Sequence, residues 1–152
     1  MHWIMKATEA RTTLLAQHDR LRGLLDTCTR LAALQSTGEP VASELDEALA
    51  ELRDAFAEHN QLETGLIGDL LRGASRWSAL LVDRMLEEHV GEHAAFWQLL
   101  SGSDAEVAQR IGELAEELDA HMAAEERTFL SPATLRDDVI HRRTRDRTPE
   151  LA

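Results

Sequence analysis

The sequence has no tyrosine and a single cysteine, Cys28, among 152 residues. One thiol cannot form a disulfide within the chain or a zinc site built on several thiolates. The lack of tyrosine excludes a tyrosine ligand or radical. Aromatic residues make up only 4% of the chain, whereas alanine, leucine, glutamate and arginine are abundant. Because these four residues favour helices, the composition predicts an all-α protein.

Positive charge and long apolar stretches are also scarce. The chain has 28 acidic residues against 16 Lys and Arg, and its formal net charge of −12 argues against nucleic acid or an anionic membrane as the main partner. No apolar run reaches the roughly 18 residues of a membrane span. Residues 1–11 lack the apolar centre of a secretory signal, so we expect a cytoplasmic protein. The length suits one domain with a real core.

Apolar residues at alternating spacings of three and four predict four long helices. We expect them at about residues 7–34, 44–73, 75–100 and 104–130. Gly38 and Pro40 break the chain between the first two, and Ser43 resembles an N-cap for the second. Residues 101–104 form a turn with further N-cap candidates. Short connections favour antiparallel neighbours, so the predicted architecture is an up-down-up-down four-helix bundle over residues 1–132.

Residues 133–152 are predicted to form a short C-terminal tail outside the bundle. Five arginines lie between Arg136 and Arg147, and this basic stretch contrasts with the acidic bundle. The simpler interpretation is a frayed terminal helix whose charge is neutralised by nearby aspartates. The alternative is a docking segment for a protein partner.

An imidazole and a carboxylate stand four residues apart in two of the expected helices, as His59 and Glu63 and as His121 and Glu125. Residues at this spacing share one face of a helix. Both pairs continue the apolar stripe of their helix, so they fall where the bundle should be driest. An unpaired buried carboxylate costs several kcal/mol, and each therefore needs a partner, a proton or a metal ion.

Three further histidines fall on the inward faces of the first and third helices: His18, His89 and His93. Counted from the turns at about 1.5 Å per residue, His18 and His89 reach the level of the two His-x-x-x-Glu pairs, and His93 lies one turn higher. A lone core histidine is more often a packing residue than a ligand. Five histidines and two carboxylates in one slab exceed what a single ion needs, which predicts a two-metal site.

The order and spacing of these candidate ligands resemble those of the hemerythrin and HHE cation-binding family. They are His18, His59, Glu63, His89, His93, His121 and Glu125. The resemblance covers about residues 7–132 and implies a four-helix bundle around a non-haem di-iron centre with an oxo or hydroxo bridge; manganese or zinc are possible occupants. It also implies that His89, His93 and His121 hold one iron. The other iron would be held by His18 and His59, with Glu63 and one later glutamate bridging the pair.

The sequence offers two neighbouring glutamates for that second bridge. Hemerythrins proper place an aspartate five residues after the last histidine, whereas HHE domains place a glutamate four residues after it. Glu125 continues the core stripe, whereas Glu126 turns about 140° away from His121 on the helical wheel. We predict that Glu125 is the bridge and keep Glu126 as the alternative.

For function, the resemblance implies a protein that binds or senses O2 or a related small molecule. Histidine-rich ligation leaves a di-iron cluster more positive than a carboxylate-rich one, which favours the diferrous state and reversible binding. One alternative is an enzyme that acts on peroxide, nitric oxide or iron. Another is an interaction module in which the metal stabilises the bundle and the tail recruits a partner.

Overall fold

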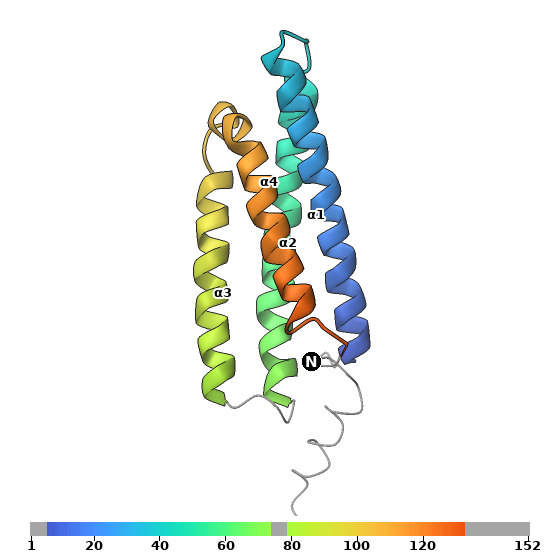
Figure 1. Cartoon of the computed structure of the whole chain (residues 1–152), viewed down its shortest axis with the longest axis vertical. Coiled ribbons are helices and arrows are strands. Elements are labelled where there is room, and N and C mark those ends of the chain that lie inside the picture. Colours follow the sequence, from blue (N-terminus) through green and yellow to red (C-terminus); the bar gives the residue numbers. More distant parts are fainter. Residues whose placement is uncertain (1–5, 74–78, 133–152) are drawn as a thin grey trace, which may run out of the picture.

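The computed structural model describes residues 6–73 and 79–132, and this part of the chain contains four α-helices and no strand. They are α1 (Ala7–Ser36), α2 (Ala42–Gly73), α3 (Ala79–Leu100) and α4 (Asp104–Arg127). Figure 1 shows the helices side by side as a bundle, in which α1 and α3 each contact both α2 and α4. The prediction of an all-α fold is therefore confirmed. No helix within the described ranges is long and apolar enough to cross a membrane.

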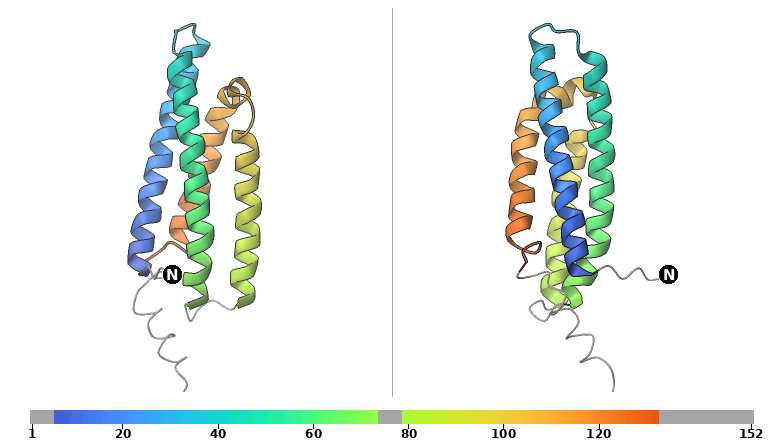
Figure 2. Two further views of the ribbon diagram at one scale, coloured as in Figure 1. Left: turned by 180° about the vertical axis from the view of Figure 1, so that it is seen from behind. Right: turned by 90° about the vertical axis from the view of Figure 1, so that its right-hand side faces the viewer.

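The first and last connections lie at the same end of the bundle (Figure 2). Gly38 follows α1 with φ 89°, a left-handed conformation that favours glycine, and its amide donates to the Gln35 carbonyl at 3.0 Å. The α3–α4 turn ends at Ser103, whose hydroxyl accepts a hydrogen bond from the Glu106 amide at 3.2 Å. Both breaks therefore occur where the sequence predicts them, and Ser103 is the N-cap.

Two predicted helix boundaries were wrong. Ser43 is not the N-cap of α2, because the Leu45 amide already donates to the Val41 carbonyl at 2.9 Å and places Ser43 inside the first turn. The fourth helix ends at Arg127 rather than at Leu130. Leu130 folds back and is fully buried, and its carbonyl accepts a 2.8 Å hydrogen bond from Arg11 on α1. Burial against α1 outweighs one further helical turn. The predicted start of the third helix and the predicted tail lie outside the described residues.

Two apolar clusters fill the bundle at different levels. The larger contains most of the buried leucines together with Phe56 and Ile111. The smaller gathers Leu14 from the start of α1 with Phe129 and Leu130 from the turn after α4. Along each helix, the buried histidines and glutamates fall between residues of the two clusters. The fold therefore encloses a polar slab between two hydrophobic layers.

Candidate metal centre

All seven candidate ligands from the sequence converge in this polar slab. They are His18 on α1, His59 and Glu63 on α2, His89 and His93 on α3, and His121 and Glu125 on α4. Six of them are buried, with exposed fractions between 0 and 6%. Only His121 is less enclosed, with 12% of its side chain exposed. The helical periodicity that buries the leucines therefore also delivers an imidazole from every helix to one level.

The ligand atoms form two overlapping groups, and within each group they lie within 4.8 Å of one another. One group consists of His89, His93, His121 and Glu125; the other consists of His18, His59, Glu63 and Glu125. Glu125 belongs to both groups. Three imidazoles on one side and two on the other match the division that the family resemblance implies.

Glu63 also lies between the two groups, because its two oxygens face different histidines. Its Oε2 atom lies 2.6 Å from His59 Nε2, and its Oε1 atom contacts His89 Nε2. Glu125 contacts two histidines of the first group, with Oε1 2.7 Å from His121 Nε2 and Oε2 3.8 Å from His89 Nε2. An oxygen of Glu125 also lies within 4.8 Å of the donor atoms of the second group. Two carboxylates that each face both groups have the arrangement of bridging ligands.

Several of these atoms make no hydrogen bond to the described residues although they are buried. They are the Nε2 atoms of His18, His89 and His121 and both carboxylate oxygens of Glu63 and Glu125. Buried polar atoms are almost always satisfied, and an unpaired buried charge is very costly. Imidazole nitrogens and carboxylate oxygens are suitable donors for iron, manganese and zinc. The residues present therefore fit a pair of bound cations.

The opposite ring nitrogen of three histidines has an acceptor outside the centre. The Nδ1 partners are Glu126 Oε2 for His18 at 3.2 Å, Gln17 Oε1 for His59 at 2.8 Å and Glu92 Oε2 for His121 at 2.8 Å. An Nδ1–H that donates outward leaves the Nε2 lone pair directed at the centre. These partners hold the rings in the tautomer and orientation that a metal ligand needs.

Glu126 is committed to this outer layer. Arg22 on α1 donates to its two oxygens at 2.8 and 3.1 Å and also binds Asp119 at 2.6 Å. The hydrogen bond from Arg22 lowers the pKa of Glu126, so the carboxylate stays ionised beside His18. Because Arg22 and His18 hold Glu126 outside the two donor groups, the arrangement supports Glu125 as the second bridge. The ligand assignment itself stays a prediction.

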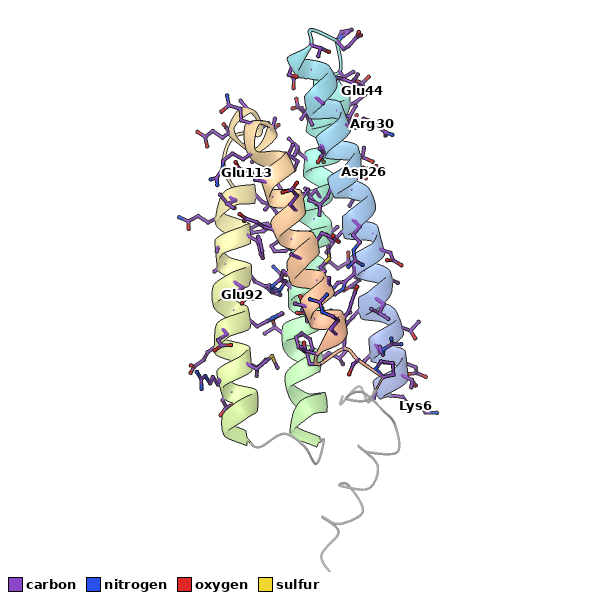
Figure 3. All side chains as sticks on the ribbon, viewed as in Figure 1. Lys6, Asp26, Arg30, Glu44, Glu92 and Glu113 are labelled. Carbon is purple, nitrogen blue, oxygen red and sulfur yellow. The ribbon has the colours of Figure 1, made fainter. Side chains whose placement is uncertain are left out.

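Sequence reasoning missed the outer partners Gln17, Arg22 and Glu92. Arg22 stands four residues after His18 and Gln17 immediately before it, but neither spacing distinguishes them from other polar residues of α1. Glu92 is 55% exposed and resembles the other surface glutamates of α3 (Figure 3 labels it midway along the helix). The packing of α1 against α2 brings Gln17 to His59, and that of α3 against α4 brings Glu92 to His121. The packing of α1 against α4 brings Arg22 to Glu126, the partner of His18.

Burial keeps the three histidines of the first group neutral. It lowers the pKa of His93 to about 3, and it also lowers the pKa values of His89 and His121. Neutral imidazole is the form that coordinates metal ions. The three imidazoles of the first group therefore stay unprotonated near neutral pH and can coordinate a cation.

The two carboxylates differ sharply in their proton affinity. Burial and the charge of Glu63 raise the pKa of Glu125 to about 11. Burial alone would also raise the pKa of Glu63, but the His18 and His59 imidazoles beside its carboxylate outweigh burial and hold that pKa well below its usual value. Two buried carboxylates at close range cannot both ionise without compensating charge, so the metal-free pair retains a proton on Glu125.

The comparison with known families agrees with this geometry. The model of the hemerythrin HHE cation binding domain matches residues 9–133, which is most of the chain. The chain therefore belongs to this family. No curated protein and no solved structure shows significant similarity to it.

Proposed function

We propose that the chain is a non-haem di-iron protein that binds or senses O2 or a related small molecule. The observation that carries the proposal is the pair of donor groups that share Glu125 within a buried slab. The proposal includes an antiparallel up-down-up-down order of the four helices, which is supported by the α1–α2 and α3–α4 connections at the same end of the bundle in Figures 1 and 2. That order lets side chains from all four helices meet at one level.

The donor set supports iron and a coordinating small ligand. Each group offers four protein donors, so a six-coordinate ion would keep positions open. Five imidazoles against two carboxylates favour the reduced state of the ions. Two ferrous ions held by these donors would supply the two electrons that reversible binding of dioxygen requires. Manganese or zinc could occupy the same donors but would not support this chemistry.

The protein itself orders the centre and borders it with aromatic and aliphatic side chains. The Phe56 ring lies 5.9 Å from that of His93, and the Phe129 ring lies 5.6 Å from that of His89. Together with the two apolar clusters, these rings border the slab with apolar surface and so strengthen electrostatic interactions inside it. Gln17 holds the orientation of His59 from outside.

The test is to load the full chain anaerobically with Fe²⁺, measure iron per chain, and record the absorption spectrum before air, after air and after removal of oxygen. We expect close to two irons per chain and a spectral change that reverses. A value of one iron or fewer per chain, in protein loaded with Fe²⁺ to saturation, would refute the di-iron proposal. Rapid consumption of peroxide or nitric oxide would instead assign the enzyme function.

Substitution of His59 tests the same centre. His59→Ala should lose metal and lower the melting temperature of the loaded chain by roughly 10 °C, because bound metal stabilises the folded state by mass action. Gln61→Ala, at an exposed position one half-turn away on α2, should change neither quantity. If His59→Ala keeps both metal ions and its melting temperature, the assignment of this ligand is wrong.

A further inference from the structure

A groove of about 780 Å³ lies between α3 and α4 and reaches the candidate metal centre. His89, His121 and Glu125 line its inner end, and the small side chains of Ala120 and Ala124 line its wall. These small side chains leave the groove open toward three of the candidate ligands. The first donor group is therefore accessible from this side of the bundle.

The second donor group is enclosed by comparison. His18 and Glu63 have no exposed surface, and His59 is 2% exposed. Glu125 is the residue that this group shares with the group at the inner end of the groove. A cation that enters through the groove therefore meets the first donor group before the second, and it can reach the second group past Glu125.

The mouth of the groove carries three carboxylates, from Glu88, Glu92 and Glu117, and one guanidinium, from Arg84. Arg84 pairs with Glu88 at 3.5 Å, and both side chains are well exposed. Glu117 makes no ion pair to the described residues. An apolar-walled groove with an excess of one charge concentrates ions of the opposite sign at its mouth. This mouth therefore attracts cations and repels anions.

A second, independent observation links the groove to a cation. Glu125 is 3% exposed, forms part of the groove lining, and has no hydrogen bond to either oxygen within the described residues. His89 Nε2 and His121 Nε2, at the same end, also lack hydrogen bonds. The groove thus leads from exposed carboxylates to buried nitrogen and oxygen atoms that make no hydrogen bond within the described part of the chain.

We propose that the groove is the access route through which divalent cations reach the centre. Glu88 and Glu117 capture the ion at the mouth, and Glu92, the third carboxylate there, contacts His121 and so connects the mouth to the donor atoms. Glu125 transfers the ion from the first donor group to the second. The inference rests on the proposed function, because it requires that the two groups hold metal ions.

The rate of cobalt uptake tests the route. Metal-free full-length chain is mixed with Co²⁺ in a stopped-flow instrument, and the visible absorption of bound cobalt is followed at low and at high salt. Glu88→Gln with Glu117→Gln should slow uptake roughly tenfold at low salt, and the difference should shrink at high salt because salt screens charge. Arg84→Gln should accelerate uptake roughly threefold.

The matched control uses the neighbouring residues Glu87 and Glu116. Both are exposed glutamates on the same two helices; Glu87 is not part of the groove lining, and Glu116 lines a separate pocket between α1 and α4. Glu87→Gln with Glu116→Gln changes the net charge equally and should leave the uptake rate within about twofold of the original.

The outcomes separate the two proposals. If the unaltered chain takes up no cobalt, the proposed metal centre fails and the route fails with it. Full uptake at equal rates in the groove variant and the original chain overturns the route alone. Equal slowing in the groove variant and the control also overturns it, because the effect is then one of net charge. Slowing confined to the groove variant, with acceleration in Arg84→Gln, supports it.

Discussion

Glu125 and Glu126 are adjacent residues with different surroundings. Glu125 is buried, and it offers an oxygen within 4.8 Å of the other donor atoms in each of the two groups. Glu126 is 24% exposed, accepts hydrogen bonds from Arg22 and lies beside His18 Nδ1. A rotation of about 100° between successive helical residues is enough to send one carboxylate to the centre and the other to its outer layer.

Conservative substitution separates these two roles. Glu125→Gln should abolish stoichiometric metal binding, because an amide cannot supply the negative charge of a bridge. Glu126→Gln should keep two metal ions per chain but weaken their binding roughly tenfold, as loss of an outer partner of a ligand histidine does. Metal titration followed by elemental analysis gives both results. Metal loss in Glu126→Gln alone would contradict the assignment and make Glu126 the bridge.

At the scale of the helices, Arg53 connects α2 to the turn between α3 and α4. Its side chain donates to the Leu100 carbonyl at 2.7 Å and to the Gly102 carbonyl at 3.3 Å, and it pairs with Asp104 at 2.8 Å. Leu100 is the last residue of α3, where carbonyls lack helical partners, Gly102 lies in the turn that follows, and Asp104 begins α4. One guanidinium therefore joins three helices.

Arg53→Ala should lower the free energy of unfolding by about 1–3 kcal/mol, since it leaves these acceptors without their partner. At this chain length, that corresponds to a decrease of roughly 2–4 °C in melting temperature for each kcal/mol. Arg30→Ala, at an exposed position of α1, is the control and should stay within about 0.5 kcal/mol. Thermal and urea unfolding measure both. Equal stability of the two variants would show that the Arg53 contacts contribute nothing.

For the whole molecule, the buried histidines and carboxylates of the slab make the metal-free chain sensitive to pH. His89, His93 and His121 have folded pKa values below the ordinary 6.5, so the unfolded chain binds more protons and stability falls as the pH falls below 6.5. Glu125 behaves in the opposite way. Its folded pKa of about 11 exceeds the ordinary 4.5, so stability falls as the pH rises through the range between them.

We therefore expect the metal-free chain to be most stable near pH 6.5. Below that value, the protons that the three histidines take up on unfolding outnumber the one proton that Glu125 releases. Above it, stability should fall by about 1.4 kcal/mol per pH unit, the effect of one proton. Urea unfolding of chelator-treated protein across pH measures this. Glu125→Gln cannot ionise and should lose the alkaline decrease. An alkaline decrease that persists in Glu125→Gln would show that another group causes it.

Much of the bundle follows from local sequence. The spacing of leucines, the left-handed Gly38 and the Ser103 N-cap set the helices and two of their ends, because helix formation and termination depend on residues within about four positions. The same periodicity places His59 and Glu63 on the core face of their helix without reference to any tertiary contact. The end of α4 was not predictable in this way, because it depends on the burial of Leu130 against α1.

The sequence by itself determined the helices and the seven side chains that face inward at one level. Tertiary structure alone decided that Glu125 belongs to both donor groups, that Glu126 joins Arg22 and His18, and that a groove opens between α3 and α4. Arg22 and Glu126 are 104 residues apart in the chain. Helical periodicity specifies which face of a helix a residue occupies. Which residue it contacts on a neighbouring helix depends on how the two helices pack, and the periodicity of one helix does not specify that packing.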